Sequence, residues 1–107
     1  MYEIIERSRI VFGEEISTWI REITSCNVIE VEAGTNGFKG GDAGHGSRTY
    51  IRIQDLAGTA INVTRMLTDG CVAGVELELA GDCELGTMIE ALEFALHVLK
   101  DQSGREA

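Results

Sequence analysis

The sequence predicts an α+β fold: a four-stranded, mainly antiparallel sheet with an N-terminal and a C-terminal helix packed on one face. Three observations support it: a helical pattern of apolar residues near the C-terminus, a second one in residues 14–24, and four alternating runs between them. Consecutive strands with short connections usually pair with their neighbours, which favours a meander. The 107 residues show no repeat or linker, so residues 1–107 are expected to form a single domain.

The N-terminal helix is predicted over residues 14–24, where Ile16, Trp19, Ile20 and Ile23 recur at helical spacing. Trp19 lies on this apolar stripe and is assigned to the core. The preceding residues 2–12 fit neither the helical nor the strand period, so their structure stays open.

Four strands are predicted from alternation of apolar and polar residues, over residues 28–33, 48–54, 60–66 and 71–80. In the first strand Glu30 and Glu32 point away from the apolar side. In the second strand the isoleucines point one way, while Arg48 and Arg52 point the other. We expect the two glutamates to lie opposite the two arginines, because the glycine-rich segment joins these strands as a long hairpin.

The C-terminal helix is predicted over residues 84–100, with Asp82 as its N-terminal cap. Its expected buried stripe consists of Leu85, Met88, Ile89, Leu92, Ala95, Leu96 and Leu99. Phe94 and Val98 widen the apolar surface beyond one stripe. The helix is therefore expected to pack on more than one side, against the sheet and, as a further option, against a partner.

The charge, apolar runs and cysteines of the sequence argue against several classes of protein. The formal net charge of −9 argues against a surface that grips DNA or RNA, which needs clustered Lys and Arg. No signal peptide and no apolar run long enough to span a membrane is present, so a cytoplasmic protein is expected. Three cysteines without C-x-x-C spacing suggest buried, reduced thiols.

The candidate site is the segment from Gly34 to Tyr50, because six of the thirteen glycines fall between Gly34 and Gly46. Such a backbone bends through positive φ and can direct several N–H groups at one ligand. It is neither a phosphate-binding P-loop nor a dinucleotide fingerprint, since it leads into a strand and not a helix. Phe38 is interpreted as an apolar anchor for this loop.

We expect the segment to bind a small anionic, nucleotide-like ligand. The candidate binding residues are Asn36, Lys39, Asp42, His45, Ser47, Arg48, Thr49, Tyr50 and Arg52. The cations would counter phosphate charge, the hydroxyls and the amide would orient the ligand, and His45 or Tyr50 would touch a base or sugar. No catalytic residue, metal or cofactor is predicted.

Other interpretations of the same residues stay open. Arg48 and Arg52 either form the floor of a pocket under the glycine loop or belong to a solvated face with compensating charges. Asp42 and His45 are too few for a zinc site. A hydrolase built on His45 and Asp42 is the third-ranked hypothesis, because no independent acid is evident to orient the histidine.

The run from Glu30 to Ile53, and the segments Val75–Leu85 and Ile89–Leu96, resemble small uncharacterised proteins of bacteria and their phages. The resemblance covers about half the chain and implies a context, a bacterial host cell, and no mechanism. Within that context the ligand would be a host immune signal that the protein sequesters.

The main hypothesis is therefore a non-enzymatic binding protein that is also a homo-oligomer, because an exposed sheet face and edges invite pairing. The alternative is an acidic phage-type protein that blocks a nucleic-acid-binding host defence effector. Against this alternative, the acidic residues are dispersed and form no tract.

Overall fold

The structure is a computed structural model that describes residues 4–24 and 28–104. Within these residues it contains six strands and one helix. In chain order they are β1 (Ile5–Val11), β2 (Glu14–Ile23), β3 (Val28–Thr35), β4 (Thr49–Ala57), β5 (Ile61–Thr68), β6 (Cys71–Leu79) and α1 (Asp82–Ser103). The α+β class is confirmed, and so is a four-stranded antiparallel sheet, although two of its strands differ from those predicted.

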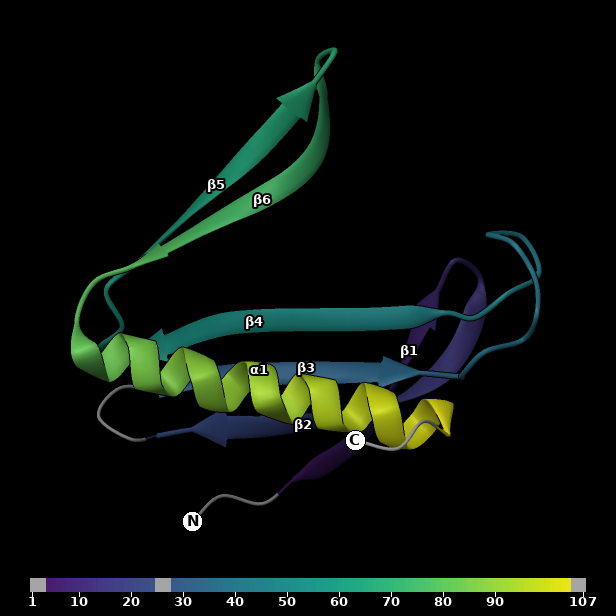
Figure 1. The fold of residues 1–107 in the computed structure, drawn as a ribbon, viewed down its shortest axis with the longest axis horizontal. Helices are drawn as coiled ribbons and strands as arrows, with labels where there is room; N and C mark the ends of the chain where they lie inside the picture. Colours follow the sequence, from purple (N-terminus) through teal and green to yellow (C-terminus); the bar gives the residue numbers. More distant parts are fainter. Residues whose placement is uncertain (1–3, 25–27, 105–107) are drawn as a thin grey trace.

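Strands β1 to β4 form an antiparallel meander in the order β1-β2-β3-β4 (Figure 1). A two-residue turn at Phe12 and Gly13 joins β1 to β2, with positive φ angles of 48° and 84°, as tight hairpins require. The predicted strands 28–33 and 48–54 are confirmed as β3 and β4. At the end of this pair Thr35 lies opposite Thr49, where the glycine-rich segment leaves the sheet.

The hydrophobic core lies between α1 and the middle of the sheet. Three residues of β3 that face the helix are fully buried, namely Ile29, Val31 and Ala33. The helix meets them with Ala91, Phe94, Ala95 and Val98. The two alanines let the helix backbone approach the sheet closely. Trp19 is partly buried and packs against this core, close to its predicted role.

The face of the sheet away from α1 is concave. Arg9 of β1 bonds to Glu32 of β3 and lies 5.1 Å from the ring centroid of Tyr50 on β4. In a flat sheet β1 and β4 would lie about 14 Å apart, since neighbouring strands are spaced by about 4.8 Å. The sheet therefore curls so that its outer strands approach each other over the concave face.

The predicted N-terminal helix is absent from the described residues, and the segment forms β2 instead. Its buried residues Ile16, Thr18 and Ile20 alternate with period two. The segment is rich in isoleucine and threonine, whose β-branched side chains favour strands. The ambiguous residues before it pair with β2 as β1.

The two later predicted strands exist but do not join the sheet. β5 and β6 pair only with each other, in a separate hairpin around the Asp69–Gly70 turn. This hairpin stands away from α1 and β4 in Figure 1. The alternation along β6 is real, but both of its faces are largely exposed.

The C-terminal helix is confirmed and extends from Asp82 to Ser103, ending at Gly104 with a left-handed φ of 79°. Asp82 is not its cap: Gly81 occupies that position and makes no side-chain cap bond. Four residues of the expected buried stripe are instead exposed, Leu85, Ile89, Leu92 and Leu96. The helix covers β3 and part of β2 and turns these residues away from that contact.

The cysteines differ from the expectation of buried, reduced thiols. Cys71 is free and exposed at the turn of the β5–β6 hairpin. Cys83 is disulfide-bonded and exposed, and Cys26 lies outside the described residues. In the part of the chain that the structure describes, no helix is long and apolar enough to cross a membrane.

Candidate functional site

The glycine-rich loop begins and ends at a neck held by two residues. The backbone N–H of Asn36 donates to the carbonyl of Arg48 at 3.1 Å, and the Arg48 N–H donates to Asn36 Oδ1 at 2.7 Å. Beside them the hydroxyls of Thr35 and Thr49 are 3.1 Å apart. The neck thus continues the pairing of β3 with β4 by one backbone bond and two bonds to side chains, and it fixes the direction in which the loop leaves the sheet.

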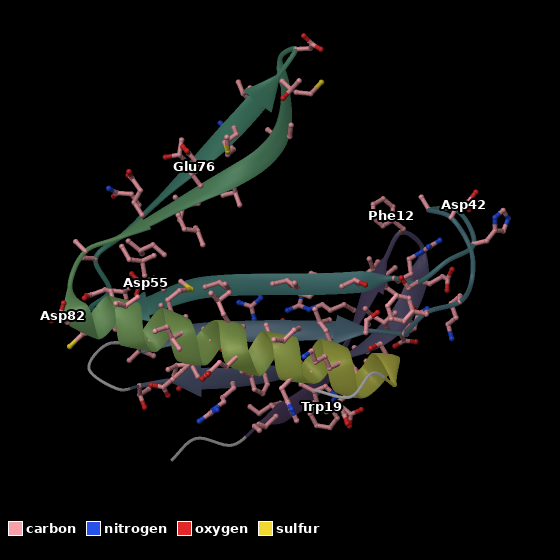
Figure 2. The ribbon with its side chains drawn as sticks, in the orientation of Figure 1. Phe12, Trp19, Asp42, Asp55, Glu76 and Asp82 are labelled. Atoms are coloured by element: carbon pink, nitrogen blue, oxygen red, sulfur yellow. The ribbon has the colours of Figure 1, made fainter. Side chains whose placement is uncertain are left out.

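The loop tip folds on itself around Asp42, which Figure 2 shows at the outer end of the loop. Asp42 Oδ1 accepts hydrogen bonds from the Gly44 N–H at 3.0 Å and from His45 Nδ1 at 3.1 Å. The bond from His45, aided by the backbone N–H groups, lowers the pKa of Asp42. Gly41 and Gly46 pack backbone against backbone, and a Cβ on Gly46 would come within 2.5 Å of the Gly41 carbonyl oxygen. These glycines serve the closure of the turn.

The Arg48 side chain fills the interior of the loop. Its side chain is buried, and its guanidinium donates to the carbonyls of Ala43, Gly44, Gly46 and Ser47 at 3.0 to 3.4 Å. It also lies 3.3 Å from Glu14 Oε2 and 6.0 Å from the ring of Phe12, in the turn between β1 and β2. The guanidinium therefore orders the loop by donating hydrogen bonds to its carbonyl groups, and it ties the loop to the neighbouring hairpin.

The concave face carries a buried ion cluster centred on Glu32, which is 0% exposed. Arg9 binds this carboxylate with Nε at 2.8 Å and Nη2 at 2.6 Å, a two-pronged contact. The Thr18 hydroxyl donates at 2.6 Å, and Arg52 adds bonds at 3.0 and 3.2 Å. Arg52 also pairs with Glu30 at 2.7 Å. All charges of this cluster have partners within the chain.

These contacts shift the pKa values of the cluster. Burial alone raises the pKa of Glu32, but the hydrogen bonds from Arg9, Thr18 and Arg52 outweigh it and lower the pKa to about 2. The bond to Glu32 raises the pKa of Arg9. Burial lowers the pKa of Arg52, but its bonds to Glu30 and Glu32 give a net increase. With these pKa shifts, Glu32, Arg9 and Arg52 are all ionised at neutral pH.

The pairing across β3 and β4 differs from the expected one by two residues. Arg52 lies opposite Glu32 and contacts both glutamates, whereas Arg48 lies beyond the last strand pair and contacts neither. The two arginines are four positions apart, about 13 Å along a strand. They therefore do not form one pocket floor.

A groove of about 530 Å³ opens on the other face, between the neck of the loop and the end of α1. Its lining residues are Thr35, Gly37, Phe38, Ser47, Thr49, Leu96, Leu99, Lys100 and Ser103. Gln102 holds the two sides together, because its side chain accepts from the Thr35 N–H and donates to the Ser17 carbonyl. None of the described residues that line the groove is acidic, although the chain carries a net charge of −9.

The structure divides the predicted site residues among four places. Ser47 and Thr49 line the groove, Lys39, Asp42 and His45 lie at the exposed loop tip, Asn36 and Arg48 build the loop, and Tyr50 and Arg52 belong to the concave face. The His45–Asp42 pair is a local turn contact with both side chains exposed. In the described ranges no group of three or more His, Cys, Asp or Glu is placed to hold a metal ion.

Sequence reasoning missed Arg9 and Lys100. Arg9 falls in the N-terminal segment whose structure stayed open, so its position over Glu32 had no signal. Lys100 ends the predicted helix, and only the tertiary fold brings it beside the loop. From sequence alone, a basic residue in the last turn of a helix indicates only a favourable interaction with the helix dipole.

No protein-family model, curated protein or solved structure matches this chain. The resemblance of the glycine-rich segment to small bacterial and phage proteins therefore stays a prediction.

Proposed function

We propose that this protein is a non-enzymatic binding protein whose groove, between the glycine-rich loop and the end of α1, takes a small ligand with a ring-like apolar body and one anionic group. The observation that carries the proposal is the composition of the groove. In an acidic chain, its described lining combines one ammonium group, several hydroxyls and apolar side chains, with no carboxylate.

The chemistry of the lining assigns a role to each part. Leu96, Leu99 and Phe38 offer an apolar surface for a base or other ring. Lys100 supplies the positive charge for a phosphate or carboxylate. Ser47 and Thr49, both predicted ligand residues, offer hydroxyls on the opposite wall. A nucleotide-like molecule, as in a sequestered host immune signal, has this combination of groups.

Because the loop is already ordered, ligand binding would cost little conformational entropy. Arg48 and Asn36 hold the wall that carries Ser47 and Thr49, so little of that wall has to be ordered by the ligand. Arg48 thus acts on the ligand indirectly, by positioning the loop, and Arg52 is engaged by two glutamates on the other face.

Thermal unfolding with a panel of mononucleotides, cyclic nucleotides and aromatic carboxylic acids tests the proposal. A true ligand at 100 times its Kd should stabilise the fold by about 2.7 kcal/mol. Lys100→Met should reduce the affinity at least tenfold, since it removes the charge partner. Arg7→Met, the same charge change on exposed β1, is the control and should leave the affinity unchanged.

Two results would contradict the groove as the binding site: no stabilisation by any class in the panel, or equal losses in Lys100→Met and Arg7→Met. Lys39→Met adds a further measurement. A loss of affinity in that variant would extend the ligand to the exposed loop tip, where the sequence predicts a contact.

A further inference from the structure

The β5–β6 hairpin has one apolar face, and this face is open to solvent. Its exposed apolar side chains are Val63, Leu67, Val72, Val75 and Leu77, each 40 to 63% exposed. A register shift after Met66 pairs Leu67 with Val72, so both ends of the hairpin contribute to the same face. The opposite face is mostly polar, with Glu76 and Glu78, and carries one exposed apolar residue, Met66. An isolated two-stranded hairpin is marginally stable in water, so this face needs a cover.

A second apolar surface lies on the flank of α1 and beside it on β4. It consists of Leu85, Ile89 and Leu92 on the helix and Ile51 on the strand, each 48 to 61% exposed. The next residue of the stripe, Leu96, lies in the groove beside the glycine-rich loop and is not counted with this surface. A helix about 10 Å wide covers roughly two strands spaced by about 4.8 Å. Since α1 packs mainly on β3 and less on β2, β4 keeps room for another element on its helix side.

The hairpin of the same chain is held away from this surface. At its base the Ala80 N–H donates to the Ala60 carbonyl at 3.1 Å. The Ala60 N–H donates to the buried carboxylate of Glu84 on α1 at 3.3 Å. Beyond this anchor the hairpin rises from the start of the helix and leans away from α1 and β4 (Figure 1). The Cα radius of gyration of 15.1 Å exceeds the value of about 13 Å for a compact chain of this length.

We propose that a second copy of this chain covers both surfaces, in a two-fold dimer in which each β5–β6 hairpin packs its apolar face on the α1 flank and β4 of the other protomer. One chain carries both complementary surfaces, so a two-fold axis satisfies all four at once and closes the assembly. Each protomer buries its own hairpin and receives that of its partner.

The area and the charges fit this arrangement. At roughly 100 Å² for each exposed side chain, the two surfaces of one protomer present on the order of 900 Å², against about 800 Å² per partner in a stable interface. Within β5 and β6, the charged residue in register with the apolar face is Arg65. On the helix side of β4 the exposed acidic residue Asp55 lies near the start of α1 (Figure 2), so the signs are complementary.

Light scattering after size exclusion, at micromolar protein, measures the mass directly. The wild-type chain should elute as a dimer. Val63→Lys places a charge on the apolar face and should raise the dissociation constant at least 100-fold. Thr64→Lys is the matched control, because the neighbouring residue points to the polar face, and it should stay dimeric. Leu92→Lys, on the exposed helix flank, should also give a monomer without disturbing the fold.

Mixing the two monomeric variants distinguishes exchange between protomers from packing within one chain. A heterodimer of Val63→Lys and Leu92→Lys retains one intact contact, between the unchanged hairpin of one chain and the unchanged helix of the other, so mixing should restore a dimer. A wild-type monomer would overturn the proposal, whether the hairpin folds onto its own helix or serves another partner. So would failure of the mixture to associate, or a monomeric Thr64→Lys.

Discussion

Replacing Glu32 with glutamine keeps the shape of a fully buried side chain and removes the negative charge at the centre of the ion cluster. The guanidinium of Arg9 loses its two-pronged carboxylate partner, and Arg52 keeps only Glu30 as an ionic partner. A fall in the pKa of Glu32 from 4.5 to about 2 corresponds to about 3 kcal/mol of stability at neutral pH. Glu32→Gln should therefore lose about 3 kcal/mol in urea unfolding at pH 7, a fall in Tm on the order of 15 °C.

The loss should depend on pH in a defined direction. Because folding lowers the pKa of Glu32, its ionised form stabilises the native state fully above about pH 5. This contribution disappears as the pH falls through 4.5 towards about 2, where the folded carboxylate takes up a proton. The difference between wild type and Glu32→Gln should therefore shrink to about 1 kcal/mol by pH 3.

Glu30→Gln is the matched control on the same strand and face. Glu30 is half-buried and has one arginine partner, so its replacement should cost at most about 1 kcal/mol. The reasoning fails if Glu32→Gln is as stable as Glu30→Gln at pH 7. It also fails if the loss in Glu32→Gln is the same at pH 7 and pH 3, because the energy would then come from shape and not from charge.

Two further predictions concern the loop and the glycines. Arg48→Lys removes the fork that bonds the loop carbonyls, so hydrogen exchange of the loop amides should accelerate while β3 stays protected; unchanged loop protection would contradict the structural role of Arg48. Gly34→Ala would bring a Cβ within 2.3 Å of the Ser17 carbonyl oxygen and should destabilise the fold by about 3 kcal/mol or more in urea unfolding. Gly86 lies on α1, where an added Cβ would meet no neighbouring side chain or strand atom within 4 Å. Gly86→Ala should therefore stabilise the fold by about 0.5–1 kcal/mol. Equal effects of Gly34→Ala and Gly86→Ala on the free energy of unfolding would refute both expectations.

Local patterns predicted the elements that tertiary packing did not have to decide. The helix near the C-terminus and strands β3 and β4 follow directly from their periodicities. The helix predicted over residues 14–24 was wrong, because the apolar pattern there fits two periods: Ile16, Ile20 and Ile23 fit a helix, while Ile16, Thr18 and Ile20 fit a strand. The β-branched content favours the strand. The turn at Phe12 and Gly13 before it was not recognised in the sequence, because a phenylalanine rarely adopts a positive φ.

The candidate groove lies beside the loop that the sequence indicated, but only part of its lining was predicted. Glycine density identified a loop with an unusual backbone, and Ser47 and Thr49 do line the groove beside it. The role of Arg48 was not predictable, because an arginine beside glycines suits an anion and a set of backbone carbonyls equally well. Only the fold shows that the loop carbonyls and Glu14 engage its two terminal nitrogens, Nη1 and Nη2. The same holds for Lys100, which reaches the groove from the far end of the chain.

An apolar stripe reports that a face is buried, but not what buries it. Two apolar patterns are as regular as those of core elements, yet their side chains stay exposed to solvent within one chain. They are the alternation along β6 and the helical stripe of Leu85, Ile89, Leu92 and Leu96. Extended exposed apolar surface is rare on soluble monomers and commonly marks an interface. The sequence pattern and the single-chain structure agree if the missing contacts are intermolecular. The regularity of the two patterns, combined with their exposure, therefore supports the proposed dimer.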